Sequence, residues 1–280
     1  MRKMIMAIAL VVVLVLVASC IFLLQVLTPY DAGYPKVYIR SDGNVEPSTT
    51  PINCNGNLYT LQANMELYKL FIEKSNITLD GNSFSMKIVS PHISKVGPEF
   101  GSIELSNVNK VTLKNLDLFY RDKPYENETG ANLIFENSAF CEALNNTVRC
   151  IHINNCHNIL VSESHCFPSF EPDVQLTNSR DCNISSCSIY SVALKNSNHN
   201  LILNNNMTFL RHHAVELEDS SSNLFFRNQL RLTGPLFEIT GSSDKNLFVG
   251  NYIQATVGQD PIIDCSGVNT FYHNNFINVY

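Results

Sequence analysis

The chain has 280 residues and a formal net charge of −6, from 19 Lys and Arg against 25 Asp and Glu, with a pI near 5.7. Because no basic cluster occurs beyond Arg2 and Lys3, the sequence excludes a nucleic-acid partner, and acidic sugars have no basic surface to attract them. Beyond the first 30 residues, the length suits one sizeable domain with a continuous core.

An apolar segment opens the chain. Residues 4–24 contain only Ser19 and Cys20 as polar members, and this run is long enough to span a bilayer. Because two basic residues precede it, the run predicts an uncleaved transmembrane helix over residues 1–30, with the rest of the chain outside the cytoplasm. The alternative is a bacterial lipobox, Val17-Ala18-Ser19-Cys20, in which Cys20 would carry a lipid.

Short apolar runs cut by Asn, Ser and Gly follow, and none is long enough for a pair of helices. Four of them share one pattern at loose spacing: SNITLDGN at Ser75, NKVTLKN at Asn109, HNILVSES at His157 and CNISSCSI at Cys182. They predict coils of short β-strands. Residues 120–146 contain Pro and Gly and two of five N-glycosylation sequons, so we expect a surface loop inserted there. The sequons begin at Asn76, Asn127, Asn145, Asn183 and Asn206.

The last third of the chain repeats strictly. NLILNNNM at Asn200, NLFFRNQL at Asn223, NLFVGNYI at Asn246 and NTFYHNNF at Asn269 start 23 residues apart, and a fixed period of this size indicates a solenoid. Coils of this length hold three short strands and three turns. A second Asn follows each first one, at Asn205, Asn228, Asn251 and Asn274. We expect two columns of stacked Asn whose amides hydrogen-bond between coils, at turn positions with a left-handed backbone.

Aromatic residues recur at the same period. Phe225, Phe248 and Phe271 should form a ladder inside the coils, because an exposed aromatic stripe would promote aggregation. Tyr252 and Tyr272 are expected on the surface, where their rings could flank a groove for a glycan.

Nine cysteines are present, and eight remain when Cys20 is set aside. An even number in an exported domain favours disulfides, and we expect at least one, between Cys141 and Cys150. The alternative is that several cysteines are small buried residues that fill the coil interior.

Acidic residues recur in the middle of apolar-x-apolar strands, where side chains point to solvent. Glu216, Glu238 and Asp264 would form an outward column about 4.8 Å apart, close enough to share a cation or to perturb one another's pKa. Arg211 and His212 lie on the preceding turn. This column is the candidate binding site, and its acids are the candidate catalytic residues. The alternative is a solvated polar face.

A second group has the residue types of a metal site. Cysteines and histidines fall close together in the sequence, a density of ligands that suits copper or zinc, although the spacing is irregular. The group comprises Cys150, His152, Cys156, His157, His165 and Cys166. Next to the acidic column, His212 and His213 are adjacent on a strand and should point to opposite faces, which disfavours shared coordination.

Taken together, four features of the sequence resemble archaeal cell-surface proteins with NosD-type repeats of the pectate-lyase-like superfamily. They are the pattern N-x-[LIF]-x-x-N, the segment FYHNNFIN, the opening VYIRSDGNVEPSTTPI and the segment NITLDGN. The resemblance covers about Val37–Val279. It implies an all-β fold, a single-chain right-handed parallel β-helix, over residues 71–280. It also implies a cap of first strands, which we place with a linker over residues 31–70.

The resemblance leaves function open, because this repeat family includes carbohydrate-binding proteins, sugar hydrolases, polysaccharide lyases and copper-site maturation proteins. The Asp-Asp and Gly-His-Gly elements of its polygalacturonase-like members are absent, which favours a non-catalytic role. We expect a membrane-anchored extracytoplasmic module that binds a polysaccharide or envelope glycan, or builds part of the envelope. The alternatives are a polysaccharide lyase or glycoside hydrolase, with bound calcium in the lyase case, and a NosD-like copper accessory protein.

Overall fold

The computed structural model describes residues 35–88, 93–94, 97–98, 101–120, 129–130, 132–167, 172–209, 213–232, 237–256, 262–265 and 267–279. The chain divides into two compact units, residues 1–34 with 91–99 and residues 35–90 with 100–280. In the first unit, β9 (Ile93–Ser94) and β10 (Gly97–Pro98) form an antiparallel pair. The predicted membrane anchor, residues 1–30, lies outside the described residues, and within the described ranges no helix could cross a membrane.

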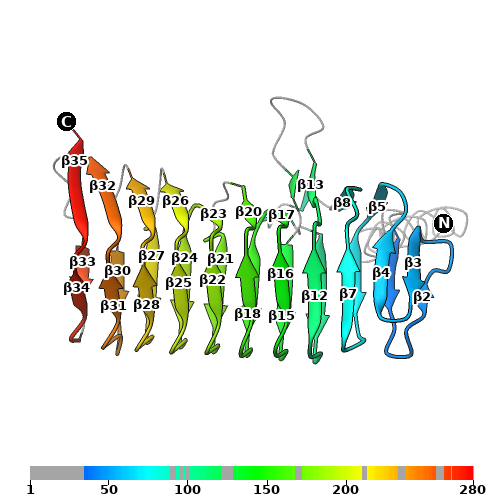
Figure 1. Cartoon of the computed structure of the whole chain (residues 1–280), viewed down its shortest axis with the longest axis horizontal. Coiled ribbons are helices and arrows are strands. Elements are labelled where there is room, and N and C mark those ends of the chain that lie inside the picture. Colours follow the sequence, from blue (N-terminus) through cyan, green and yellow to red (C-terminus); the bar gives the residue numbers. More distant parts are fainter. Residues whose placement is uncertain are drawn as a thin grey trace, which may run out of the picture. The chain divides into compact units, whose positions relative to one another are not determined.

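The second unit is a stack of coils, each of which carries three short strands (Figure 1). Along most of the stack, every strand pairs in parallel with the strand at the same place in the next coil, so three sheets run through the coils. We call them the first, second and third sheets, in the order in which a coil passes through them. The all-β, coiled architecture predicted from the 23-residue period is confirmed.

The first sheet has 11 strands. Their order is β2 (Val45–Glu46), β1 (Lys36–Ile39), β6 (Lys69–Ile72), β11 (Ser102–Ser106), β15 (Asn132–Glu136), β18 (Ile151–Asn154), β21 (Val174–Thr177), β24 (Val192–Lys195), β27 (Val215–Glu218), β30 (Phe237–Thr240) and β33 (Ile262–Cys265).

The second sheet also has 11 strands. Their order is β3 (Ile52–Asn55), β4 (Leu58–Leu61), β7 (Ile77–Asp80), β12 (Val111–Lys114), β16 (Glu142–Leu144), β19 (Leu160–Ser162), β22 (Asn183–Ser185), β25 (Leu201–Leu203), β28 (Leu224–Phe226), β31 (Leu247–Val249) and β34 (Thr270–Tyr272).

The third sheet has seven strands, and two short pairs accompany it. Its order is β17 (Thr147–Val148), β20 (His165–Cys166), β23 (Ser188–Ile189), β26 (Asn206–Phe209), β29 (Gln229–Leu232), β32 (Tyr252–Thr256) and β35 (Asn275–Val279). The short pairs are β5 (Met65–Leu67) with β8 (Met86–Ile88), parallel, and β13 (Phe119–Tyr120) with β14 (Thr129–Gly130), antiparallel.

Antiparallel pairing occurs at the start of the stack, in the segment predicted as linker and cap. Strand β1 pairs antiparallel with β2, and β3 pairs antiparallel with β4. Both hairpins join the long sheets, because β1 also pairs in parallel with β6 and β4 with β7. The described part of residues 31–70 is therefore continuous with the coil stack.

The core lies inside the coils because apolar and polar residues alternate along each strand. In β27, for example, Val215 and Leu217 are buried, whereas Glu216 between them faces out. The predicted aromatic ladder is inside: the Phe248 ring stacks on Phe225 at 4.7 Å and on Phe271 at 4.5 Å between centroids.

Two columns of buried Asn run between the sheets, as predicted. Each Asn except the last of its column donates its N–H and its Nδ2 to the Oδ1 of the Asn one coil further on, at 2.9–3.1 Å. The columns consist of Asn200, Asn223, Asn246 and Asn269, and of Asn205, Asn228, Asn251 and Asn274. Upstream, the N–H groups of Cys182 and Cys187 donate to the first Asn of each column.

The left-handed turn position is not the ladder Asn itself, contrary to the prediction. A positive φ occurs one residue earlier, at 54° in Asn204 and 54° in Arg227, just before Asn205 and Asn228. The ladder Asn must point inward to reach the next coil, so the left-handed residue before it makes the turn on the outside. Selection for Asn in the ladder therefore comes from its side-chain hydrogen bonds.

A third ladder, of serines, was not predicted. The N–H of Ser179 donates to Ser197 Oγ at 3.1 Å, that of Ser197 to Ser220 Oγ at 3.0 Å, and that of Ser220 to Ser243 Oγ at 3.0 Å. These serines lie in the turn between the first and second sheets. Each coil thus satisfies buried backbone donors through side chains of its neighbour.

The predicted loop insertion over residues 120–146 is shorter than expected. Coil strands resume with β15 at Asn132, and Asn145 lies in the turn after β16. The part from Asn132 to Asn146 is therefore coil, because Leu133 and Phe135 alternate into the core.

The seven cysteines whose side chains the structure describes form no disulfide. Cys54 is exposed, and six others are buried, so the expected Cys141–Cys150 disulfide is wrong and the alternative of small core residues holds. Burial raises the pKa of the Cys182 thiol to about 12 and that of Cys156 to about 11, which keeps both thiols neutral.

Candidate functional site

Coil length varies mainly at one place in the coil, the connection from the third sheet to the first. The second and third sheets are joined by a residue pair such as Arg227 and Asn228. The connection from the third sheet to the first differs in length between coils: in one coil it consists of Arg149 and Cys150 alone, and in the next it comprises residues 167–173. Insertions therefore gather at the border of the first sheet. Variable connections on a rigid scaffold commonly carry function, which makes the outer face of the first sheet a candidate surface.

Two members of the predicted acidic column lie on this face. Glu216 and Glu238 are paired in register, and their side chains are 35% and 41% exposed. The third member is displaced: a register shift after Glu238 pairs Glu238 with Ile263 and Ile239 with Cys265. Asp264 is thus not the next residue of the column, a correction that the apolar-x-apolar pattern could not foresee, because a bulge inserts an unpaired residue.

His213 completes a group that the sequence reading undervalued. Its Nδ1 lies 2.9 Å from Glu238 Oε2 and 3.6 Å from Glu216 Oε1, and one ligand atom from each residue lies within 4.8 Å of the others. We call these three residues the His213 cluster. Among the described residues, it is the one group of three His, Cys, Asp or Glu side chains that converge in this way.

The two tyrosines predicted beside the column do not lie there. Arg211 and His212 lie outside the described residues. Half-buried Tyr252 is on β32 of the third sheet, and Tyr272, 57% exposed, is on β34 of the second. The predicted binding set is therefore divided among three faces of the coil.

The predicted Cys and His group is divided in the same way. His152 lies on the first sheet, His157 in the turn after it and His165 on the third sheet, while Cys156 and Cys166 are buried inside the coil. The His157 ring meets the edge of Phe140 at 5.3 Å, and the His165 ring meets Phe167 at 4.7 Å. The structure does not bring these residues together as one ligand set.

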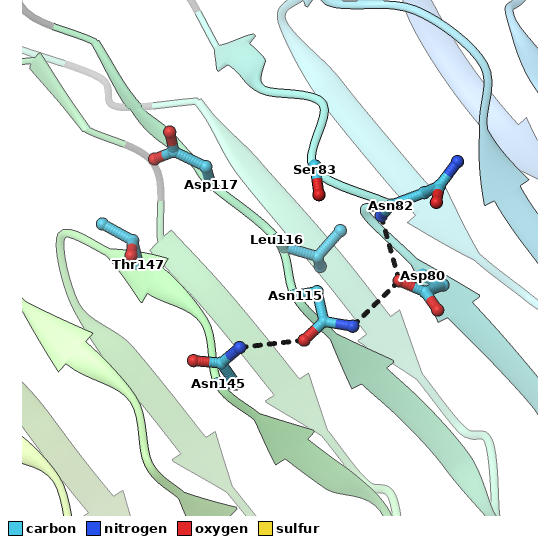
Figure 2. Close-up of a pocket in the computed structure, with 8 residues that line it drawn as sticks. All are labelled: Asp80, Asn82, Ser83, Asn115, Leu116, Asp117, Asn145 and Thr147. Atoms are coloured by element: carbon cyan, nitrogen blue, oxygen red, sulfur yellow. Dashed lines mark hydrogen bonds between the residues drawn. The ribbon is translucent and has the colours of Figure 1, made fainter.

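A polar hollow opens where the second sheet turns into the third, in the N-terminal half of the stack (Figure 2). Three of its side chains form a line across successive coils: Asn145 Nδ2 donates to Asn115 Oδ1 at 2.9 Å, and Asn115 Nδ2 donates to Asp80 Oδ1 at 3.0 Å. The hollow is lined by Asp80, Asn82, Ser83, Asn115, Leu116, Asp117, Asn145 and Thr147.

The chain passes close to itself at one wall of this hollow. A Cβ at Gly81 would collide with the backbone carbonyl of Asn115, so a glycine permits the approach. Asp80 also accepts a hydrogen bond from the N–H of Asn82 at 2.9 Å and pairs with Lys114 at 3.0 Å. Burial alone would raise the pKa of Asp80, but these donors and the Asn115 amide lower it, so the carboxylate is charged.

Sequence reasoning missed this hollow. The available signal was the sequon Asn145-Asn146-Thr147, whose acceptor Asn and hydroxyl both line it, together with the Asp80-Gly81-Asn82 turn. The residues of the line come from positions 80, 115 and 145, and the irregular spacing of those early coils hid their alignment.

Three parallel sheets wound into coils, with ladders of buried side chains at the turns, define a parallel β-helix protein. Residues 75–280 match the family model described as "Periplasmic copper-binding protein (NosD)", so the chain belongs to the NosD family. This agrees with the predicted family and with an extracytoplasmic location. No curated protein matches the chain.

Several solved structures are similar at low sequence identity. PfbA, a surface adhesin of Streptococcus pneumoniae, is 13% identical, with a TM-score of 0.42 over 79% of this chain and 70% of that one. ORF18 of Geobacillus virus E2 is 12% identical, with a TM-score of 0.45 over 81% and 56%. The periplasmic alginate epimerase AlgG is 11% identical, with a TM-score of 0.36 over 86% and 83%.

The copper in the family description can be tested against the donors present. Reduced copper prefers thiolate and thioether ligands, but the cysteines that could supply a thiolate, such as Cys156 and Cys182, are buried and neutral. The His213 cluster offers one imidazole nitrogen and two carboxylates. That set fits a divalent ion and does not fit Cu⁺.

Proposed function

We propose that this protein is an extracytoplasmic β-helix that binds neutral saccharide chains in the polar hollow, tethered by the predicted anchor over residues 1–30. The observation that carries the proposal is the hydrogen-bonded line from Asp80 through Asn115 to Asn145. It holds amide and carboxylate groups at fixed positions on three successive coils, and preorganised polar groups of this kind favour binding.

The chemistry of the hollow suits sugar hydroxyls. An Asn side chain both donates and accepts, a carboxylate accepts from hydroxyl groups, and Ser83 and Thr147 add hydroxyls that do either. Neighbouring hydroxyls of a sugar ring need such paired donors and acceptors. Among the residues that the structure describes, no aromatic ring lines this hollow, so binding rests on hydrogen bonds, and several coils would contact one chain.

The charge of the hollow defines the substrate class. Asp80 and Asp117 both line it, and Lys114 is already paired with Asp80. Two carboxylates would repel uronic acids or sulfated sugars at short range. The proposal is therefore limited to neutral saccharides, in agreement with the net charge of −6.

The hollow replaces the acidic column as the proposed glycan contact. The backbone register pairs Glu238 with Ile263 and not with Asp264, and Glu238 is also paired with His213, so that group is better suited to another ligand. Catalysis is not part of the proposal. The Glu216 and Glu238 oxygens of the cluster lie within 4.8 Å, closer than the separation of about 6.5–9.5 Å that an inverting glycosidase uses.

A glycan array with the full chain in detergent micelles tests the proposal. We expect retention on neutral oligosaccharides and none on uronate or sulfated ones. Retention confined to acidic glycans, or no retention on any glycan at micromolar protein, would overturn it. Incubation of the same saccharides with the protein, followed by analysis for shortened or unsaturated products, separates binding from hydrolase or lyase activity.

A further inference from the structure

We propose that His213, Glu216 and Glu238 form a binding site for a borderline divalent transition-metal ion, for which Zn²⁺ is the probe. This inference is independent of the saccharide proposal, because the cluster lies on the first sheet, whereas the hollow lies between the second and third. The family description names copper but no residues. The His213 cluster identifies the residues that would donate to the ion, and its donor set prefers divalent ions to Cu⁺.

The backbone fixes the two carboxylates. Glu216 and Glu238 occupy the same position of adjacent parallel strands, whose spacing of about 4.8 Å cannot relax without breaking the sheet. Buried neighbours on both sides of each acid, Val215 and Leu217 in one strand and Phe237 and Ile239 in the other, hold the strands in place. Both side chains must therefore project in parallel from one face.

His213 is aimed at the space between the acids. Its Nδ1 is 2.9 Å from Glu238 Oε2 and 3.6 Å from Glu216 Oε1. Two ligands of a tetrahedral ion with bonds of about 2.0–2.2 Å lie about 3.4 Å apart, so the observed separations bracket the required one. The two carboxylate oxygens lie within 4.8 Å of each other, and rotation of the partly exposed Glu side chains can bring them to the same separation.

The charges around the cluster favour a cation. On the neighbouring strands, Glu216 is paired with Ala193 and Glu238 with Ile263, and both partners are uncharged. Lys195, on the next strand, is engaged at 2.8 Å with Glu218 instead. Two carboxylates with a neutral imidazole carry a charge of −2, which a divalent ion would neutralise.

The donor set selects the class of ion. Calcium takes six to eight oxygen ligands, whereas the cluster supplies three ligands, one of them nitrogen. Reduced copper needs sulfur, which the cluster lacks. Imidazole with carboxylates suits Zn²⁺ and Cu²⁺, and solvent would fill the open position, since the three side chains are only half buried.

Calorimetric titration of the untagged full chain with Zn²⁺ tests the site. We expect one saturable site in the wild type and a loss of affinity of at least about tenfold, equivalent to about 1.4 kcal/mol, in the variant Glu216→Gln/Glu238→Gln. The matched control is Glu218→Gln, which removes an acid from the same strand but outside the cluster and should bind Zn²⁺ as the wild type does. Thermal unfolding checks that each variant is folded.

Spectroscopy supplies a second readout. With Cu²⁺ as the probe, electron paramagnetic resonance should show coupling to one imidazole nitrogen, which His213→Gln abolishes. Equal Zn²⁺ affinity in the wild type and the double variant, or no saturation at millimolar Zn²⁺, would overturn the proposal. Failure here leaves saccharide binding untouched, because the double variant retains the hollow.

Discussion

Asn228 Oδ1 accepts two hydrogen bonds from Asn205, one coil earlier: one from the backbone N–H at 2.9 Å and one from Nδ2 at 3.1 Å. Asn228 in turn donates to Asn251 in the same way. A buried side chain of one coil thus satisfies the buried backbone of the coil before it, which links coils more directly than the strand pairing alone.

Replacement of Asn228 by Val should therefore destabilise the coil stack. The change removes the acceptor of the buried Asn205 backbone N–H and one of the two acceptors of its side-chain amide, and an unsatisfied buried polar group costs roughly 1–3 kcal/mol. We expect a loss of about 3 kcal/mol or more in the free energy of unfolding, measured by urea denaturation. The neighbouring exposed Gln229→Val is the matched control and should change little; an equal effect of both would contradict the ladder.

The aromatic stack can be tested with two adjacent residues of one strand. Phe225 is 2% exposed and stacks on Phe248, whereas Phe226 faces out beneath Arg227, 4.8 Å from the guanidinium carbon to the ring centroid. Phe225→Ala should cost about 3–5 kcal/mol, and Phe226→Ala about 1 kcal/mol or less, the value of an exposed cation–π contact. Similar losses from both in thermal or urea unfolding would show that the interior assignment is wrong.

The free thiols predict a specific labelling pattern. Under native conditions, iodoacetamide should modify Cys54 and spare the buried cysteines such as Cys141, Cys150 and Cys182, because burial shields them and raises the pKa of the thiols of Cys141 and Cys182. Peptide mapping by mass spectrometry reads out each site. A dithiothreitol-sensitive Cys141–Cys150 peptide would contradict the free-thiol structure.

Asp173 predicts a pH dependence of stability. Its carboxyl group is fully buried, and burial raises its pKa to about 7. A backbone hydrogen bond from Tyr190 and the charge of Arg149 lower the pKa, but by less than burial raises it. Because the folded pKa exceeds the unfolded value of 3.8, the folded state holds an extra proton between about pH 4 and 7. The stability that this proton provides is therefore lost progressively as pH rises from about 4 to about 7, by up to about 4 kcal/mol in total.

Asp173→Asn should remove that loss. In urea unfolding, the difference in free energy between pH 5 and pH 8 should be smaller in Asp173→Asn than in the wild type, and the variant should be the more stable protein at pH 8. Asp181→Asn, at an exposed turn, serves as the control and should keep the wild-type difference. An unchanged difference in Asp173→Asn would show that Asp173 does not govern this transition.

How much of the molecule could be predicted from the sequence depends on the length of each coil. The 23-residue coils from Asn200 onward were predicted down to their hydrogen-bonded Asn columns, because nothing is inserted between equivalent positions. Upstream, ladder partners are 18 or 30 residues apart, as for Cys182 with Asn200 and Leu116 with Asn146. Variable connections to the first sheet cause these differences and hide the alignment of the polar hollow.

The candidate site shows the same limit. Glu216 and Glu238 fall on adjacent strands as their pattern predicts, since strand alternation is a local property. Asp264 lies on the next strand, β33, but is not paired with Glu238, because a register shift depends on how two strands meet and leaves no mark in the pattern itself. We discounted His213 as a metal ligand because it is adjacent to His212 on the predicted strand. The informative spacing was instead its position three residues before Glu216.

The most direct test of the proposed function compares two single substitutions to Gly at the same turn position of different coils, one in the hollow and one outside it. Asn145 and Asn204 each precede a ladder Asn with positive φ, 52° and 54°, so Gly preserves either turn. Isothermal titration of a neutral oligosaccharide retained on the array should give affinity for Asn204→Gly equal to that of the wild type, and a loss of tenfold or more for Asn145→Gly. Equal affinities for all three proteins would contradict saccharide binding in the hollow.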